Sequence, residues 1–360
     1  MLQINFIRDH QQEVTDRLQV KNFDAREIIP QIINVDNQRR EAQKLLDDIL
    51  ARSNKMAKEI GILFKAGKQE EANALKAQTG DLKKEGQALT EQMNTLKTDL
   101  DALLVQLPNL PHPSVPRGNT EDDNEIISEE SFEVDLPDGA KAHWELASDY
   151  DIIDFESGSK VTGGGFPFYK GKGAHLQRGL VNFFLDEALK AGYVEFQPPL
   201  LVNEDSAYGT GQLPDKDGQM YHVGLDNLYL IPTSEVPITN IYRDVILKVD
   251  ELPIKNAAFS SCFRREAGSY GKDVRGLNRL HQFDKVEIVQ VQHPDKSYDT
   301  LEEMKDHVAA LCRMLGLPFR ILRLCGGDLS FTAALTYDFE VYSAAQGKWL
   351  EVSSVSNNES

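Results

Sequence analysis

The chain has 360 residues, of which 41% are hydrophobic, and a formal net charge of −18 at pH 7. This size and apolar content suit a sizeable core and favour two or three domains over one compact globule. The acidic balance argues against a broad nucleic-acid surface, because phosphate binding rests on clustered Lys and Arg side chains. No run approaches about eighteen apolar residues, and the amino terminus soon meets charge, so we expect a cytoplasmic protein.

The first third of the chain has the clearest hydrophobic periodicity. Apolar positions step by four and three residues from Ile28 to Leu63 and again from Leu75 to Leu107, as heptads do. The polar segment KAGKQEEA separates the two runs. The pattern predicts an antiparallel hairpin of two long helices over about 28–104. Composition leaves its role open between a structural or dimerising coiled coil and an arm with a local basic stripe.

Proline-rich sequence ends this periodicity. LPNLPHPSVPRG carries four prolines, which forbid continuation of the helix and favour extended chain. We therefore place the helical arm at 1–105 and a linker, first Pro-rich and then acidic, at 106–160. Within the linker, residues 121–156 include fourteen acidic residues and one lysine. A second domain is expected over 161–360.

The second domain begins with the glycine-rich segment VTGGGFPFYKGKG. It fails as a phosphate loop, because five residues instead of four separate its glycines and its lysine is followed by Gly, so we predict tight turns. Amphipathic helices are predicted near 174–191 and 297–314, and short strands fill the rest. Without repeated strand-helix units, an α+β domain on an antiparallel sheet fits best. Cys262, Cys312 and Cys325 lack C-x-x-C spacing, which predicts buried, reduced thiols.

The stretch SSCFRREAGSYGKDVRGLNRLHQFDKVEIV, residues 260–289, reads as two strands joined by a long basic loop. Side chains alternate between faces along a strand, so Arg264 and Glu266 are expected on one face and Arg265 on the other. On the returning strand, the face opposite the apolar one carries Phe283, Lys285 and Glu287. Guanidinium, aromatic ring and carboxylates together suit a nucleotide and amino-acid pocket, with a salt-bridged sheet face as the structural alternative.

This stretch resembles motif 2 of class II aminoacyl-tRNA synthetases, and in detail the seryl-tRNA synthetase family of bacterial type. GYVEFQPPLLVNEDSAYGTGQLP is similar to the family's motif 1, LIPTSEVPITN to its serine-selecting loop, and TYDFEVYSAAQGKWLEVSSVSN to the segment that leads toward motif 3. The N-terminal helical arm also matches. The resemblance implies a class II catalytic domain on an antiparallel sheet flanked by helices, with motif 1 at about 174–202 and motif 2 at about 257–291.

The resemblance also implies the roles of individual residues. The catalytic residues would be Arg264, Arg279 and Glu351. Serine would be bound by Thr233, Ser234, Glu235, Arg264 and Glu287. ATP would be bound by Arg264, Arg265, Glu266, Arg279, Phe283, Glu351, Val352, Ser353 and Ser354. Glu351 and Ser354 would hold Mg²⁺, which fits oxygen-only ligation.

The implied reaction attaches L-serine to tRNASer, and where present tRNASec, through a seryl-adenylate made from ATP. The implied assembly is a homodimer in which the arm binds tRNA. The chain ends at Ser360, where the family continues into motif 3, so truncation and a doubtful activity of this 360-residue chain are expected. The alternatives are a catalytically defective relative or fragment that binds tRNA or a protein partner through the arm, and a coiled-coil scaffold.

Overall fold

The computed structural model describes residues 2–131, 139–215, 218–266 and 276–359. The chain divides into two compact units. The first comprises Met1–Glu121 with Cys325–Leu329, and the second comprises Asp122–Leu324 with Ser330–Glu359. No helix among these described residues is long and apolar enough to cross a membrane.

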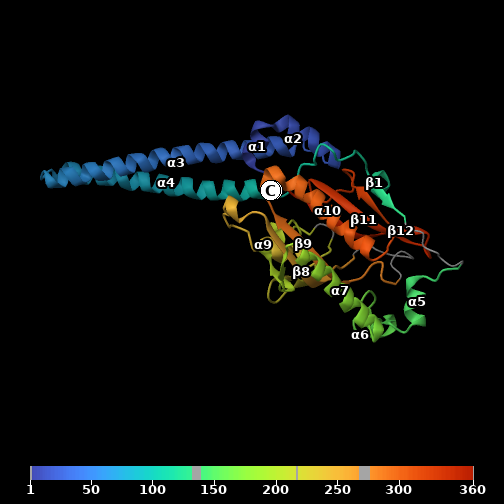
Figure 1. Ribbon diagram of the computed structural model, residues 1–360. Helices are drawn as coiled ribbons and strands as arrows, with labels where there is room; N and C mark the ends of the chain where they lie inside the picture. The colour runs from blue at the N-terminus through green and yellow to red at the C-terminus, as the bar shows by residue number, and fades with distance from the viewer. Residues whose placement is uncertain (1, 132–138, 216–217, 267–275, 360) are drawn as a thin grey trace. The chain divides into compact units, whose positions relative to one another are not determined.

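The first unit is a long helical hairpin with two short helices at its base. Its helices are α1 (Ile4–Asp9), α2 (Gln11–Leu18), α3 (Ile28–Lys65) and α4 (Gln69–Leu104). α3 and α4 lie side by side and antiparallel (Figure 1), which confirms the predicted hairpin. Its seam buries positions of the heptad pattern, among them Ile32, Ala42 and Ile49 on α3 and Leu82 and Leu96 on α4.

The base of the hairpin has its own apolar core, which the heptad pattern did not predict. The ends of α3 and α4 pack there against α1 and α2. The buried members are Ile7, Val14, Leu18, Ala25, Ile29, Ile32, Leu100, Leu104, Leu107 and Leu110. Because a two-helix seam buries little surface, this cluster supplies much of the apolar burial that holds the hairpin together.

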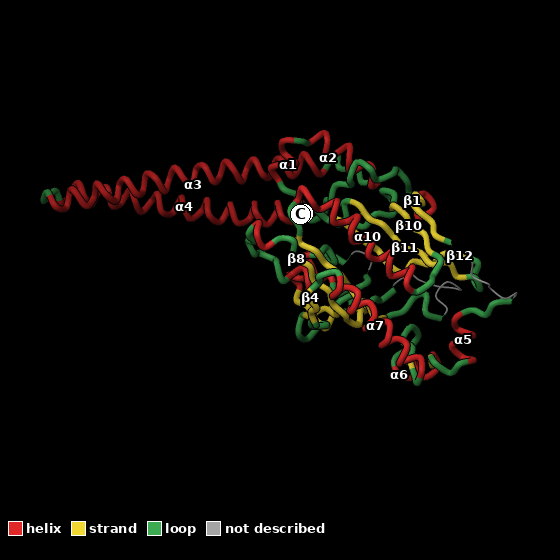
Figure 2. The backbone as a smooth tube through the Cα atoms, viewed as in Figure 1, coloured by secondary structure: helices red, strands yellow, loops and turns green. Residues whose placement is uncertain are grey.

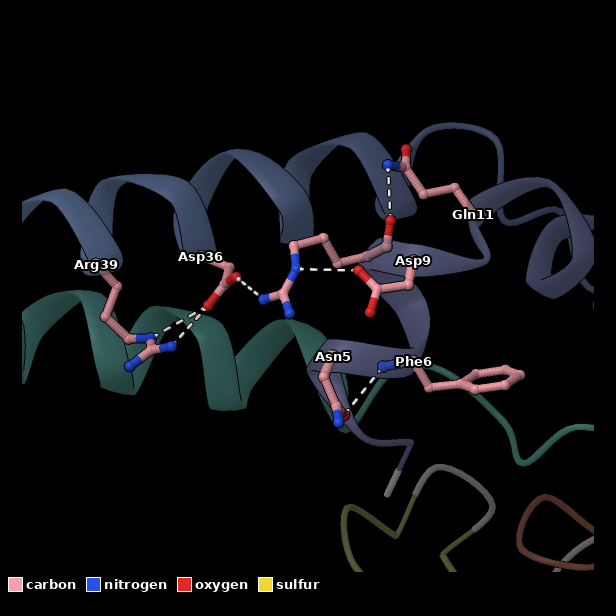
Figure 3. A network of polar contacts seen from close by, with 7 residues as sticks. Asn5, Phe6, Asp9, Gln11, Asp36 and Arg39 are labelled. Carbon is pink, nitrogen blue, oxygen red and sulfur yellow. Dashed lines mark hydrogen bonds and ion pairs between the residues drawn. The ribbon is translucent and has the colours of Figure 1, made fainter.

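A buried carboxylate ties α1 to α3 at the same end (Figure 3). Asp36 on α3 is fully buried, and the guanidinium of Arg8 from α1 donates to its Oδ2 at 3.1 Å. Arg39, one turn along α3, donates to Oδ1 at 2.8 Å. A buried carboxylate without access to water needs such partners, and the two arginines supply them inside the unit.

We predict that the two arginines substitute for each other in stabilising the first unit. The double variant Arg8→Met with Arg39→Met strands a buried carboxylate and should lose about 3–5 kcal/mol of unfolding free energy. Each single variant should lose only about 1 kcal/mol, because the other arginine still neutralises Asp36. Urea denaturation followed by circular dichroism measures the losses.

The matched control is Arg26→Met, which removes the partner of an exposed aspartate, Asp24. That variant should unfold at the wild-type urea concentration. Single losses that simply add up to the double loss would contradict the shared neutralisation.

Four sheets make up the β structure that is described in the second unit. The largest is antiparallel, in the order β1-β10-β11-β12 (Figure 2), with strands β1 (Glu125–Glu130), β10 (Phe319–Arg323), β11 (Leu335–Ser343) and β12 (Lys348–Asn357). The second has the order β4-β8-β9, with strands β4 (Val194–Phe196), β8 (Ile254–Phe263) and β9 (Gln282–Val291). A third sheet has the order β5-β7-β6, with strands β5 (Leu201–Asn203), β7 (Leu228–Leu230) and β6 (His222–Val223). In the fourth, β2 (Ile153–Asp154) pairs with β3 (Phe168–Tyr169).

Helices flank these sheets. They are α5 (His143–Asp149), α6 (Phe155–Val161), α7 (Lys172–Lys190), α8 (Glu204–Gly209), α9 (Glu235–Asn240) and α10 (Ser297–Met314). Short 3-10 turns lie at Gln19–Lys21, Glu121–Asp123, Val249–Glu251 and Pro294–Lys296. α7 packs on β8 and β9, and α10 packs on β12. The α+β class and the helices near 174–191 and 297–314 are confirmed.

Two details differ from the sequence-based picture of the second unit. β4 runs parallel to β8, so the predicted antiparallel sheet is mixed at this edge. The prolines after β4 direct the chain away from that sheet, and β5 pairs with β7 instead. The region interpreted as a linker also contains structure: β1 pairs with β10, and α5 and α6 follow. The acidic residues that the structure describes here therefore lie mainly along a sheet edge and in short helices.

Candidate active site

The antiparallel pair β8–β9 places polar and apolar side chains on opposite faces. Val286 and Ile288 of β9 pack into an apolar cluster with Leu185 and Ala188 of α7. The alternate positions of β9, which are Phe283, Lys285 and Glu287, lie opposite Cys262, Ser260 and Ala258 of β8. The period of two along a strand thus separates a core face from a candidate site face.

A compact ionic cluster lies on the site face. Thr233 Oγ1 donates to Glu287 Oε2 at 2.7 Å, and Lys285 Nζ lies 2.7 Å from the same carboxylate oxygen. Lys285 also donates to Thr233 Oγ1 at 3.1 Å. The sequence analysis placed Lys285 on this face but did not include it among the binding residues. Its position two residues before Glu287, on the same strand face, indicates that the two side chains can form an ion pair.

Glu235 completes this cluster from the start of α9. Burial and the nearby charge of Glu287 raise the pKa of Glu235, while Lys285 and Arg264 oppose that rise. Asn358 Nδ2 lies 3.5 Å from Glu235 Oε1. Burial lowers the pKa of Lys285, but the charge and hydrogen bond of Glu287 together with the charge of Glu235 outweigh it, so this pKa is raised as well. Lys285 and Arg264 thus oppose the charges of Glu235 and Glu287, and because the pKa of Glu235 stays raised, an additional cation would stabilise its ionised form.

Buried hydroxyl and thiol groups support the cluster from behind. Ser234 Oγ and Ser260 Oγ are hydrogen-bonded, and Ser260 Oγ lies 3.4 Å from Cys262 Sγ. Ser234 and Cys262 are fully buried. The structure therefore places Ser234 in contact with β8 at the position opposite Lys285, where its hydrogen bond fixes the backbone between Thr233 and Glu235. Cys262, Cys312 and Cys325 are all buried thiols outside any disulfide, which confirms the prediction.

Arg264 lies beside the ionic cluster at the end of β8. Its guanidinium carbon is 5.2 Å from the centroid of the Phe283 ring, and its backbone N–H donates to His281 O at 3.0 Å. A planar guanidinium over an aromatic face forms a cation–π contact and leaves N–H groups for an anion. Arg264 and Phe283 are thus brought together, as the alternation argument expected.

The alternation argument is wrong for the residues after Arg264. β8 ends at Phe263, the backbone N–H of Arg265 donates to Gln219 O at 2.9 Å, and Glu266 has φ of 49°. A residue in the left-handed region breaks the alternation of side chains, so the strand pattern no longer decides on which face Arg265 and Glu266 lie. Glu266 instead meets Arg279, whose Nη1 lies 3.6 Å from Glu266 Oε2.

The basic loop between the two strands is described only at its ends. Two of its predicted cations, Lys272 and Arg275, lie outside the described residues. Arg279, near the end of the loop, lines a pocket of about 660 Å³. The lining residues are Lys141, Trp144, Glu145, Ser148, Asp149, Phe155, Gly165, Gly276, Arg279 and Leu280.

The remaining site residues lie on β12, in the four-stranded sheet. Glu340 pairs with Glu351 while Phe339 pairs with Ser353, so Val352 is an extra residue in a β-bulge. Residues three apart on a regular strand lie on opposite faces, but this bulge returns Ser354 to the face of Glu351. Sequence alternation alone would have separated the two oxygen ligands expected for Mg²⁺.

Lys285 provides a test of the charge balance in the cluster. Lys285→Met removes the cation that contacts Glu287 and leaves only Arg264 to oppose the charges of Glu235 and Glu287, and we expect a loss of about 2 kcal/mol in unfolding free energy at pH 7. This is less than the ~3–5 kcal/mol for a fully buried pair, because the Lys285 side chain is 34% exposed.

Urea denaturation at pH 7 and pH 5 measures the loss, and Lys285→Arg is the charge-retaining control. The loss should be smaller at pH 5, where a carboxylate with a raised pKa takes up a proton and relieves the repulsion. A loss that grows at pH 5 would contradict the proposed charge balance.

Comparison with known proteins agrees with this geometry in both units. Residues 221–360 match the tRNA synthetase class II core domain (G, H, P, S and T). The mixed sheets, the Arg264–Phe283 contact and this match define a class II aminoacyl-tRNA synthetase core. Residues 1–111 match the Seryl-tRNA synthetase N-terminal domain.

Full-length relatives identify the family. A serine–tRNA ligase from Salinibacter ruber is 48% identical over 100% of this chain and 84% of its own length. The crystal structure of seryl-tRNA synthetase from Pyrococcus horikoshii complexed with ATP is similar at TM-score 0.89 and 31% identity, over 100% of this chain and 85% of that one. A Naegleria fowleri serine–tRNA ligase in complex with AMP reaches TM-score 0.84 at 27% identity, over 99% and 84%. The chain belongs to the seryl-tRNA synthetase family of class II serine–tRNA ligases.

Proposed function

We propose that this protein condenses L-serine with ATP to form seryl-adenylate and then transfers the seryl group to tRNASer and, where present, tRNASec. The arrangement of Thr233, Glu235, Lys285 and Glu287 beside the Arg264–Phe283 pair carries this proposal. It joins an amino-acid pocket to an aromatic and cationic surface suited to a nucleotide. ATP and AMP in the two related structures support the nucleotide.

The serine pocket follows from the charges of the cluster. Glu235 and Glu287 offer carboxylate oxygens to the substrate ammonium, and Thr233 holds Glu287 in place. The same carboxylates can accept the hydroxyl proton of serine. A pocket built to bond a hydroxyl rejects alanine by roughly 10⁴-fold, because its polar groups would be left unpaired. Threonine is excluded by size.

The ATP site is proposed around the motif 2 residues. Phe283 would stack on adenine, Glu266 would accept from its amino group, and Arg264 would bind the α-phosphate and the serine carboxylate. Arg279 would reach the γ-phosphate, with Arg265 nearby. In this arrangement, Arg264 exchanges part of its contact with Phe283 for the two anions, which fits its position at the edge of the ionic cluster.

Mg²⁺ is proposed at β12. The bulge places Glu351 and Ser354 on one face, beside Val352 and Ser353 of the proposed ATP surface, and both donor atoms are oxygens, so these residues fit the ion. Among the described residues there is no cluster of three or more His, Cys, Asp or Glu side chains suited to a metal. Glu351 and Ser354 would therefore share Mg²⁺ with phosphates and waters. When bound, the ion neutralises phosphate charge.

The chemistry needs no protein nucleophile. The serine carboxylate attacks the α-phosphorus and pyrophosphate leaves, and then a terminal ribose hydroxyl of tRNA attacks the adenylate carbonyl and AMP leaves. Arg264 and Arg279 contribute by aligning the two substrates and neutralising the charge that develops on the phosphates. The residues of the site thus act by position and charge.

The helical arm and the sheet edge at β4 are the surfaces that we propose for tRNA and for a second copy of the chain. The arm carries exposed cations suited to the backbone of tRNA, namely Lys55, Lys58, Lys65, Lys76, Lys83 and Lys84. α7 and β4 expose apolar side chains, with Leu176 61% and Val194 60% exposed, next to an unpaired edge of the β4-β8-β9 sheet. We propose that the arm binds tRNA and that this edge forms a homodimer.

Arg264 is the sharpest test of the proposed activity. In a serine-dependent pyrophosphate exchange assay, Arg264→Ala should lower the rate at least about 10²-fold, the usual cost of removing a preorganised charge stabiliser. Arg243→Ala is the matched control, because Arg243 is exposed and bonds Ser206 and Asn240 instead. Equal rates for the two variants would refute the role of Arg264. A wild-type protein that binds tRNA without any exchange would favour a catalytically defective relative.

Glu235 generates a pH prediction for serine binding. The substrate ammonium prefers the ionised carboxylate, whereas burial and Glu287 raise the pKa of Glu235 and favour its protonated form. Serine affinity should therefore rise as pH increases through that raised pKa, with proton release on binding. Calorimetry in buffers of different ionisation enthalpy measures the protons released. Glu235→Gln should bind weakly and without this pH dependence, and an unchanged slope would contradict the assignment.

A further inference from the structure

His143, the first residue of α5, contacts the segment that leads back into β9. The backbone N–H of Leu277 donates to His143 Nε2 at 2.7 Å, although the two residues are 134 positions apart. Nε2 accepts this hydrogen bond, so the imidazole is neutral and carries its proton on Nδ1. None of the sequence motifs that indicated the site includes His143.

Backbone packing reinforces the hydrogen bond. Gly276, next to Leu277, has φ of 73°, and a Cβ added there would lie 2.2 Å from His143 Nε2. The conformation favours glycine, and a larger residue there would displace the imidazole from Leu277. The imidazole therefore rests directly on the chain at the end of the long loop.

The short segment from Leu277 to His281 is held at both ends. His143 fixes Leu277, while the N–H of His281 donates to Gly165 O at 2.9 Å and its carbonyl accepts from Arg264 at 3.0 Å. Arg279 lies between these two anchors. If the first anchor is lost, the backbone that carries Arg279 is fixed at one end only among these contacts, and its guanidinium retains the ion pair with Glu266 at 3.6 Å.

α5 provides a fixed support for the imidazole. Glu145 Oε2 accepts from the N–H of Ala142 at 2.9 Å, which caps the start of the helix. At the other end, the N–H of Ile152 donates to Ala147 O at 3.0 Å, and the chain continues directly into β2. The side chain of His143 thus projects from an element that is held at both ends.

We propose that His143 is a positioning residue for the ATP reaction: its Nε2 holds Leu277 and thereby places Arg279 for contact with the triphosphate. This inference rests on the proposed function of Arg279. A displacement of about 1 Å at a substrate-binding group can cost roughly 10²-fold in rate, so one hydrogen bond to the backbone is sufficient to matter.

The charge state of the imidazole agrees with this role. Burial lowers the pKa of His143, so the neutral form that can accept from Leu277 persists to more acid pH. The charged groups around the adjoining pocket are Lys141, Glu145 and Asp149 near α5 and Arg279 from the returning segment. Protonation removes the acceptor, so the contact is present above the lowered pKa and lost as the pH falls through it.

Two substitutions separate the hydrogen bond from the mere presence of a polar side chain. His143→Gln carries an amide oxygen at about the reach of Nε2, whereas the shorter side chain of His143→Asn ends near Nδ1. In serine-dependent pyrophosphate exchange, kcat/KM for ATP should fall roughly 10²-fold in His143→Asn and recover to within about 3-fold of wild type in His143→Gln. The acid limb of the wild-type pH profile that belongs to His143 should disappear in His143→Gln.

A double-mutant cycle tests whether His143 acts through Arg279. In an Arg279→Ala background, His143→Asn should cost less than about 2-fold, because the group that it positions is already gone. Amide hydrogen exchange gives a readout without activity: Leu277 should lose protection in His143→Asn and keep it in His143→Gln. Additive effects on the rate, or equal protection of Leu277 in both variants, would overturn the inference.

The assays also separate this inference from the proposed function. Wild-type exchange together with a fully active His143→Asn would refute only the positioning role. Wild-type protein without exchange would refute the proposed activity, and calorimetric ATP affinity would then decide the role of His143. Equal affinities for His143→Asn and His143→Gln would in that case refute the positioning role as well.

Discussion

The antiparallel pairing of β8 with β9 is the constraint on which the candidate site depends. The register runs without interruption from Ile254 opposite Val291 to Phe263 opposite Gln282. It directs Val286 and Ile288 into the core under α7 and leaves Lys285 and Glu287 on the face of the candidate site. A slip of one residue would exchange these faces, exposing the apolar set and burying the charges. The core therefore enforces the geometry of the pocket through the hydrophobic effect.

Charge balance then decides what the pocket can hold. Lys285 and Arg264 oppose the charges of Glu235 and Glu287, but burial and the charge of Glu287 still raise the pKa of Glu235. In the proposed function, the ammonium of the substrate adds a positive charge beside Glu235 and thereby favours its ionised form. A similar arrangement has a different outcome in the first unit. There Arg8 and Arg39 each donate to one carboxylate oxygen of the buried Asp36, and this contact holds α1 against α3.

Elements with strong local periodicity were predictable from the sequence. The hairpin of α3 and α4 follows from its heptads, and α10 from its amphipathic pattern, because both patterns depend on residues within one or two turns. The face of β9 that carries Phe283 and Glu287 was predictable for the same reason. The assignment failed at Glu266, whose left-handed backbone ends the strand rule. The helices α1 and α2 were missed, because short segments carry little periodic signal.

Residue types and their local periods thus set the helical arm, the two faces of β9 and the chemistry offered by the motif residues. Contacts between distant segments decided the rest. Lys285 contacts Thr233 only because the segment between β7 and α9 packs against β9. Glu351 and Ser354 share a face only because the pairing of β12 with β11 contains a bulge. His143 contacts Leu277 although 134 positions of sequence separate the two residues. Such pairs leave no local pattern, because the hydrogen bonds and packing that create them exist only after the chain has folded.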